Sequence, residues 1–205
     1  MSDAPVYCPF YCEENIWQLC AHPRAAAAER RVLFISNPDR RVAMWGQRAS
    51  QDPKLPIAWD YHVVLLLRQR SCGQPGAWEV WDLDALDPGP RPAEDWLRDS
   101  FDRGSLLPRR YTPRFRMVDA DEYRRHFRSD RRHMRRSDGT VIRPPPPWPA
   151  ILGEPPACAP ADDGSNLERF IDTEDAGFLG RLFDLDELWR WLRESGEPSG
   201  VTALL

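Results

Sequence analysis

The chain has 205 residues and a formal net charge of −4, from 28 basic and 32 acidic side chains. This length is sufficient for one domain whose core needs no metal or disulfide support. The slightly acidic balance excludes a whole-chain basic field for nucleic acid or anionic membranes, and no apolar run approaches the ~20 residues that span a bilayer.

The N-terminus and the cysteines indicate a reducing compartment. Residues 1–15 lack a basic segment followed by an apolar one, so they do not form a secretory signal. The cysteine count of five is odd, which favours free thiols. Cys8 and Cys12 form a C-x3-C pair, but no second close pair or clustered His completes a zinc site, so no metal is expected. We expect a cytoplasmic protein, also nuclear if the source is eukaryotic.

Residues 11–20 are predicted to form a helix that begins at or beside Cys12, because apolar residues recur there at helical spacing. A thiol at a helix N-terminus meets unpaired N–H groups and the positive end of the dipole, which lower its pKa. Glu13 and Glu14 act in the opposite direction, so a neighbouring imidazolium would be needed to secure the thiolate. The alternative is that Cys12 is a small buried apolar residue.

Two hairpins are predicted in the first half of the chain. Residues 30–36 and 40–45 read as strands that turn at an Asn-Pro-Asp sequence. The stronger signal comes from the arms 59–67 and 78–84, which flank a connector with Gly and Pro.

In the second hairpin, a turn at the middle of the connector, near residue 72, pairs His62 with Asp82 on one face of the sheet. A carboxylate opposite an imidazole fixes one ring nitrogen and leaves the other as a base. A satisfied polar cross-strand pair is the alternative reading of this contact.

Downstream elements follow from capping and periodicity. The sequence predicts a helix starting near 92–94, a strand over 115–120, a helix with an Asp cap over 119–127, a segment over 166–171 and a last helix within 183–192. Asp184 and Glu187 resemble a capping box for that last helix. Residues 1–6 and 197–205 are expected to fray, leaving one catalytic domain over 1–205.

An arginine-rich tract occupies residues 124–136 and carries seven Arg and two His. Nucleic-acid binding is one interpretation of such a tract. The negative net charge favours instead a solvated loop, in which Ser129, Asp130 and His133 are structural or line a pocket.

The run PPPPWP at 144–149 is predicted to be extended polyproline II. It could serve as a ligand for SH3-type domains. A stiff strap packed over the domain is the favoured interpretation.

Cys12, His62 and Asp82 follow one another in the order nucleophile, base and orienting acid, one of the recurring acyl-transfer triads. The same order is typical of papain-like and transglutaminase-like folds. We therefore expect a single α/β domain of the α+β type, papain/transglutaminase-like, with a mainly antiparallel sheet flanked by helices.

Seven motifs together resemble the protein N-terminal glutamine amidohydrolase family over about Tyr7 to Trp191. They are YCEENIW (11–17), FISN (34–37), WDYHVVLL (59–66), DLD (82–84), SDRRHM (129–134), PPPPWP (144–149) and NLERFI (166–171). The resemblance implies that Cys12, His62 and Asp82 are the catalytic residues.

The resemblance also implies the reaction, which is hydrolysis of the side-chain amide of an N-terminal Gln to give N-terminal Glu and ammonia. In eukaryotes this step feeds arginylation and N-degron proteolysis, whose enzymes would be downstream partners. The chemistry requires no cofactor. We expect a monomer that binds Gln-initiated proteins or peptides, with no nucleic-acid or membrane partner.

Selection of the first residue requires acceptors for a free α-ammonium. Glu14, Asp60 and Asp130 are candidates by charge and motif membership, with Trp59 and Tyr61 as walls of the pocket.

Two rival functions remain open from the sequence. One is another cysteine enzyme on the same triad, a peptidase or a transglutaminase. The other is a non-catalytic adaptor that binds partners through the proline strap or the arginine tract.

Overall fold

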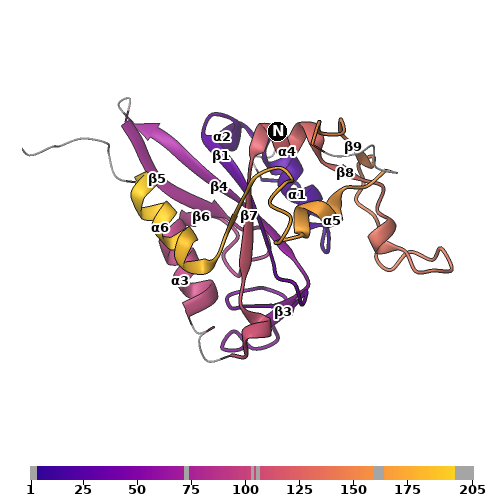
Figure 1. Cartoon of the computed structure of the whole chain (residues 1–205), viewed down its shortest axis with the longest axis horizontal. Coiled ribbons are helices and arrows are strands. Elements are labelled where there is room, and N and C mark those ends of the chain that lie inside the picture. The colour runs from indigo at the N-terminus through magenta and orange to yellow at the C-terminus, as the bar shows by residue number, and fades with distance from the viewer. Residues whose placement is uncertain (1–3, 72–73, 103, 105–106, 159–163, 197–205) are drawn as a thin grey trace, which may run out of the picture.

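A six-stranded sheet forms the centre of the protein in the computed structural model, which describes residues 4–71, 74–102, 104, 107–158 and 164–196. The strand order is β10-β7-β1-β4-β5-β6, and each pairing within these residues is antiparallel (Figure 1). Two small sheets, β2-β3 and β8-β9, lie outside it.

The strands are β1 (Glu29–Ser36), β2 (Val42–Met44), β3 (Ile57–Trp59), β4 (His62–Ser71), β5 (Gln74–Trp81), β6 (Pro90–Pro92), β7 (Arg114–Asp119), β8 (Arg128–Ser129), β9 (Ile151–Leu152) and β10 (Arg181–Phe183). The helices are α1 (Cys12–Leu19), α2 (Pro23–Ala26), α3 (Ala93–Phe101), α4 (Ala120–His126), α5 (Leu167–Ile171) and α6 (Leu185–Gly196), with 3-10 turns η2 (Arg109–Tyr111) and η3 (Arg132–Met134).

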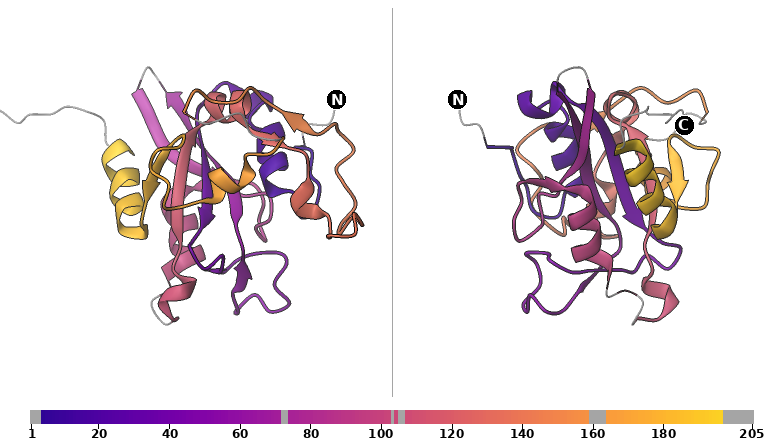
Figure 2. Two further views of the ribbon diagram at one scale, coloured as in Figure 1. Left: turned by 45° about the vertical axis from the view of Figure 1, so that its right-hand side comes forward. Right: turned by 90° about the vertical axis from the view of Figure 1, so that its left-hand side faces the viewer.

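Helices cover both faces of the sheet (Figure 2). Because strand side chains alternate, Phe34 and Val63 pack under α1, α4 and α5, while Leu33 and Val64 pack under α3 and α6. Strands β1 and β4 are thus buried on both sides, which explains their continuous apolar runs. The predicted single domain of mixed α and β content, with a mainly antiparallel sheet and flanking helices, is confirmed.

Local capping signals identify two helix starts correctly. The Asp119 carboxylate accepts hydrogen bonds from the first turn of α4. At α6 the Glu187 N–H donates to Asp184 Oδ1 (2.8 Å) and the Asp184 N–H donates to Glu187 Oε2 (2.9 Å), which is the predicted capping box. The helix expected near 92–94 begins at Ala93.

The predicted hairpin between 30–36 and 40–45 is wrong. Strand β1 pairs with β4 and β7, and β2 pairs with β3. The Asn37 side chain turns the chain away from the sheet, because its amide donates to the carbonyls of Arg41 (2.8 Å), Arg110 (2.9 Å) and Thr112 (3.0 Å). Both neighbouring positions of β1 are then filled by strands remote in sequence.

The predicted hairpin of the central strands is confirmed as the antiparallel pair β4 and β5, but its register is wrong by two residues. Leu65 lies opposite Trp81, whereas the predicted register places it opposite Glu79. The pairing continues to Ser71 and Gln74, with an irregularity between Arg68 and Arg70, and the predicted turn centre near residue 72 is outside the described residues. A shift of two keeps each side chain on its predicted face.

The ends of the two central strands also differ from the prediction. Strand β4 begins at His62, and Trp59 belongs to the separate strand β3. Asp82 directly follows β5 and is not part of a strand.

The proline segment 144–149 packs against α1 through one buried carboxylate. The Trp148 indole donates to Glu14 Oε2 (2.7 Å), and Arg131 donates to both Glu14 oxygens (2.8 Å each). Arg131 also donates to the carbonyls of Trp148 (2.9 Å) and Pro149 (3.3 Å). The segment therefore acts as the predicted strap over the domain.

Some expectations fall outside what the structure describes. These are the expected fraying of residues 1–3 and 197–205. Within the described residues, no helix has the length and apolar character needed to cross a membrane.

Candidate active site

Cys12 stands at the first position of α1, as predicted, and lines a cavity of about 440 Å³. The helix start is not capped by the side chain of Tyr11, whose hydroxyl donates instead to the Arg143 carbonyl (3.2 Å). The first-turn N–H groups therefore stay available beside the thiol. Other residues around the cavity include Phe10, Trp59, Asp60, Tyr61, Asp84, His133 and Met134.

His62 and Asp82 form a buried pair, with 2.9 Å between His62 Nε2 and Asp82 Oδ1. The side chains are only 1% and 2% exposed. The second carboxylate oxygen accepts from Gln47 Nε2 (3.1 Å) and Trp96 Nε1 (3.2 Å), and the Asp84 N–H donates to Oδ1 (3.0 Å). The carboxylate that orients the imidazole is itself held by three further donors.

The His62 ring is also held by stacking on its face. One of its two nitrogens makes no hydrogen bond within the described residues. The Trp59 ring stacks on it, with centroids 5.4 Å apart and planes 11° from parallel. His62 Nδ1 is buried and has no hydrogen-bond partner among the described residues. Cys12 Sγ is 3.8 Å from Glu13 Oε2 and accepts from the Val63 N–H, and no hydrogen bond joins it to His62 in the described part of the chain.

The cysteine is poised as a neutral thiol. Burial raises the pKa of Cys12 well above its ordinary value, Glu13 and Asp84 raise it further, and the Val63 N–H opposes them. A positive helix end is therefore insufficient here, and a base must accept the proton of Cys12.

The imidazole has the properties of that base. Burial alone would lower the pKa of His62, but the charge of Asp82 and its hydrogen bond outweigh burial and raise it. Burial would likewise raise the pKa of Asp82, whereas His62, with the Gln47 and Trp96 donors, lowers it. The arrangement can hold a proton on His62 during a thiol reaction.

The predicted substrate-binding residues divide into two groups. Trp59, Asp60 and Tyr61 line the Cys12 cavity. Glu14 is fully buried in its contacts with Arg131 and the strap, away from that cavity. Asp130 pairs with Arg132 (2.6 Å) and lines a neighbouring cavity of about 160 Å³.

Several residues that shape the site were not among the predicted catalytic or substrate-binding residues. Asp84 lines the cavity and accepts from the Tyr7 hydroxyl (2.5 Å). Fully buried Glu13 accepts from the Tyr61 hydroxyl (2.9 Å), and its Oε1 lies 3.5 Å from His133 Nε2.

Membership in the YCEEN and DLD motifs could have singled out Glu13 and Asp84. No local signal could have found Gln47 or Trp96, because Gln47 lies 35 residues from the Asp82 it contacts.

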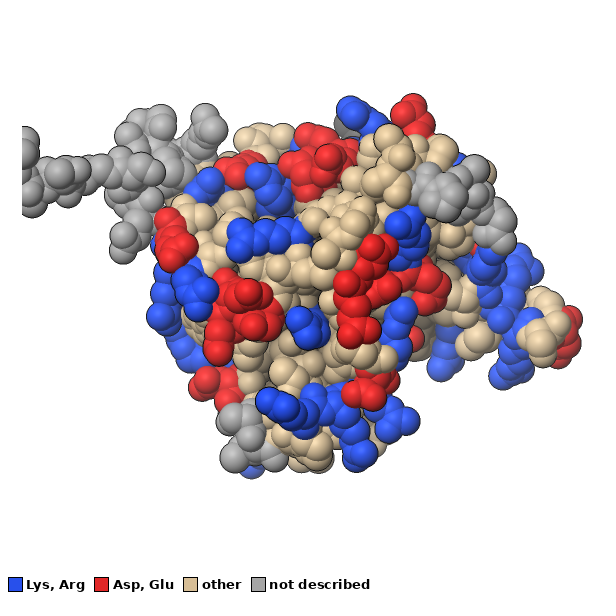
Figure 3. All heavy atoms as spheres, in the orientation of Figure 1, with Lys and Arg blue, Asp and Glu red and all other residues tan. Residues whose placement is uncertain are grey.

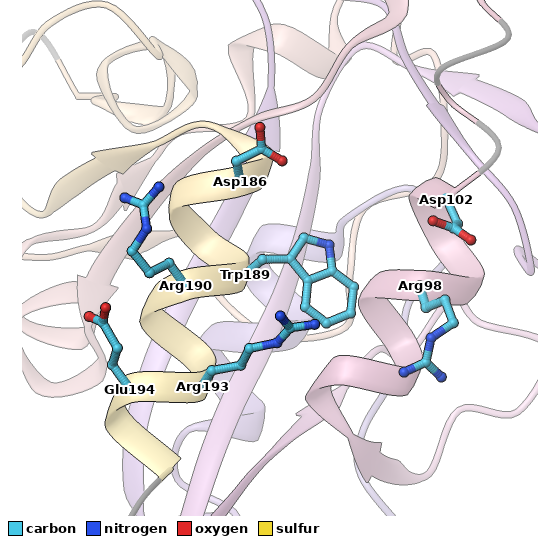
Figure 4. A pocket seen from close by; sticks show the side chains of 7 residues that line it. All are labelled: Arg98, Asp102, Asp186, Trp189, Arg190, Arg193 and Glu194. Atoms are coloured by element: carbon cyan, nitrogen blue, oxygen red, sulfur yellow. The ribbon is translucent and has the colours of Figure 1, made fainter.

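Another cavity, of about 680 Å³, lies between α3 and α6 and is lined by none of the motif residues (Figure 4). The Trp189 ring projects toward α3 between two arginines, Arg98 and Arg193. The described residues that line this cavity include no Cys or His. No cluster of three or more potential metal ligands occurs in the described residues. The Cys12 cavity, by contrast, is lined by Cys12 and by residues of the WDYHVVLL, DLD and SDRRHM motifs.

The arginine tract is largely engaged in the fold. Arg131 binds Glu14, Arg132 binds Asp130, and the Arg124 guanidinium lies 4.7 Å from the centre of the Trp17 ring. Basic and acidic side chains are intermixed over the face shown in Figure 3. Of the three residues expected to be structural or pocket-lining, Ser129 is fully buried and His133 lines the Cys12 cavity.

A cysteine at a helix start and a buried His–Asp pair are the kinds of side chain that thiol-dependent hydrolases use. A family model described as N-terminal glutamine amidase matches residues 7–192. The protein N-terminal glutamine amidohydrolases of Bos taurus and Homo sapiens are each 36% identical over 189 residues, covering 90% of this chain and 86% of the relative. The protein of the same name from Arabidopsis thaliana is 34% identical over 182 residues, covering 85% of this chain and 78% of the relative. The chain belongs to the N-terminal glutamine amidase family, a family of hydrolases that act on an amide.

Proposed function

We propose that the protein hydrolyses the side-chain amide of an N-terminal Gln in proteins or peptides, using Cys12 as nucleophile, His62 as base and Asp82 as orienting acid. The observation that carries the proposal is the fixed His62–Asp82 pair with its second ring nitrogen unused, stacked on Trp59, which lines the same cavity as Cys12. The names of the relatives support the substrate.

In the first half of the reaction, His62 accepts the Cys12 proton as sulfur attacks the amide carbon. The N–H groups at the start of α1 donate to the oxygen that becomes negative, and one such donor contributes about 2.7–4 kcal/mol in the transition state. His62 then gives the proton to the leaving nitrogen, so ammonia departs and a thioester remains.

In the second half, water attacks the thioester while His62 takes its proton. The carbon–sulfur bond breaks, Cys12 recovers a proton from His62, and the product is N-terminal Glu. Asp82 keeps the imidazole in one tautomer through both steps. These steps need no group beyond the side chains, the helix start and water.

The test is mass spectrometry of a Gln-initiated peptide after incubation with the protein. We expect the mass increase that accompanies conversion of an amide to a carboxyl group, with release of ammonia and an intact backbone. A cleaved backbone would indicate a peptidase, and incorporation of an added amine would indicate a transglutaminase. No reaction with any Gln peptide, together with partner binding lost on strap substitution, would favour the adaptor.

The cysteines provide matched controls for the thiol mechanism. Cys12→Ala and Cys12→Ser should abolish turnover and retain the fold by circular dichroism. Ala or Ser at Cys8, Cys20, Cys72 or Cys158 should leave the chemical step in place, although Cys20 is fully buried and its substitution should lower stability. Comparable turnover by Cys12→Ala would refute the mechanism.

A further inference from the structure

We propose that the Asp84 carboxylate binds the α-ammonium of the substrate's first residue and thereby confers selectivity for a free N-terminus. This inference rests on the proposed function and adds a residue that neither the family motifs nor the relatives' names assign to this task.

Asp84 is a buried acid without a cation. It is 8% exposed, and none of the ion pairs formed by the described residues includes it. Glu168, which also lines the cavity, is already paired with Arg40 (2.9 Å), and Glu14, away from the cavity, is paired with Arg131. A buried carboxylate without an opposite charge is costly, which suggests that its partner arrives with the substrate.

The Asp84 carboxylate is held in position by one neutral donor. The Tyr7 hydroxyl donates to Oδ1 over 2.5 Å, and the Arg48 guanidinium lies 4.6 Å from the centre of the Tyr7 ring. Burial and this hydrogen bond to Asp84 raise the pKa of Tyr7, so the phenol stays a donor. A neutral donor such as this phenol fixes the orientation of the Asp84 carboxylate without neutralising its charge, so the carboxylate can still bind a cationic ligand.

The position of Asp84 suits a Gln residue whose amide lies at Cys12. Both residues line one cavity, and they are close enough for the charge of Asp84 to raise the pKa of the Cys12 thiol. In Gln, the α-nitrogen and the amide carbon are separated by three carbons, a span of roughly 5 Å. One cavity of this size can therefore hold both ends of the residue.

Two other acids near Cys12 are less suitable. Asp60 is exposed, so water screens its charge, and its Oδ1 accepts the Tyr61 N–H (2.9 Å). Glu13 does not line the cavity, and it already accepts from the Tyr61 hydroxyl and faces His133. Asp84 combines burial, access to the cavity and a free charge.

The experiment compares two peptides that differ only in the α-amine, a Gln-initiated peptide and the same peptide beginning with a glutaramoyl group, at about pH 6.5 where the amine is charged. Asp84→Asn should lower kcat/KM for the Gln peptide about 30-fold or more, mainly through KM. It should change kcat/KM for the glutaramoyl peptide by less than about 3-fold. Asp60→Asn is the matched control and should retain the wild-type preference.

Binding supplies a second measurement if the wild-type protein turns over the glutaramoyl peptide too slowly to measure. In the Cys12→Ala protein, calorimetry should show tighter binding of the Gln peptide than of the glutaramoyl peptide. Adding Asp84→Asn should abolish this difference. An equal loss on both peptides would mean that Asp84 is only structural, and loss of preference in Asp60→Asn would move the site there. Failure of the wild-type protein to deamidate the Gln peptide would instead contradict the proposed function.

Discussion

The two oxygens of Asp82 receive different sets of donors, and this decides how sensitive the residue should be to substitution. His62 and the Asp84 N–H contact Oδ1, while Gln47 and Trp96 contact Oδ2. An asparagine at position 82 has only one accepting oxygen, so its NH₂ group must face one of these two sets of donors. Either the imidazole loses its acceptor at residue 82, or the side chain of residue 82 loses the hydrogen bonds from Gln47 and Trp96 that hold it in place.

We therefore expect Asp82→Asn to lower kcat by about 10²–10⁴ while the fold is retained, which corresponds to about 3–5 kcal/mol of barrier. Steady-state kinetics on a Gln-initiated peptide, with circular dichroism, measures this. Asp84→Asn should act mainly through KM and lower kcat much less. A larger kcat loss in Asp84→Asn than in Asp82→Asn would show that the orienting acid is misassigned.

The His62–Asp82 pair should also leave a mark on stability against pH. The folded pKa of Asp82 lies below 3.8, so its contribution is present above that value and is lost as pH falls through the folded pKa. The folded pKa of His62 lies above 6.5, so its contribution is complete below that value and is lost as pH rises through the folded pKa.

The wild-type protein should therefore have a higher unfolding free energy than Asp82→Asn, and this difference should be largest between about pH 4 and 6.5. Urea titrations of both proteins across pH 3–9 provide the measurement. A constant difference across this range would mean that the pair does not titrate with folding.

At the scale of elements, α1 depends on a contact that comes from far along the chain. Glu14 is fully buried, and its partner Arg131 is only 13% exposed. The same guanidinium binds the strap carbonyls of Trp148 and Pro149. One arginine thus joins the helix that carries Cys12 to two segments of the second half of the chain.

Removal of that arginine should be costly. Arg131→Met leaves Glu14 buried with no cation and should lower the unfolding free energy by about 3 kcal/mol. Arg132→Met, which breaks the more exposed pair with Asp130, should cost under about 1 kcal/mol. Urea unfolding followed by fluorescence compares the two variants, and equal losses would contradict a special role for Arg131.

Elements set by local signals could be predicted, and those set by remote contacts could not. The Asp184–Glu187 box marks the start of α6 within four residues of sequence. The supposed hairpin after β1 failed because Asn37 bonds to carbonyls near residue 111, which no local pattern reveals.

The candidate site shows the same division. The motifs single out His62 and Asp82, and their contact is observed although the register is shifted. The contacts that Tyr7 and Gln47 make within the site depend on tertiary packing, since Tyr7 lies 77 residues from Asp84.

For the whole molecule, the shared sheet joins two apolar cores into one unit. Phe170 of α5 packs on one face and Leu97 of α3 on the other, and both are fully buried. Because strands β1 and β4 contribute side chains to both cores, unfolding of one core should also unfold the other.

We expect Phe170→Ala to cost about 3–5 kcal/mol and Leu97→Ala about 2–5 kcal/mol. In each variant, far-UV circular dichroism and tryptophan fluorescence should report one coincident thermal transition. Two separated transitions in either variant would show that the faces unfold independently.

The two outermost strands of the sheet have a consequence for behaviour at high concentration. An open strand edge offers unpaired backbone groups on which another chain can add, which is a common origin of aggregation. Here β6 reads Pro-Arg-Pro, so two of its three residues lack an N–H, and β10 is only three residues long. Neither outermost strand therefore offers a long row of unpaired backbone groups to which a neighbouring molecule could add its own strand.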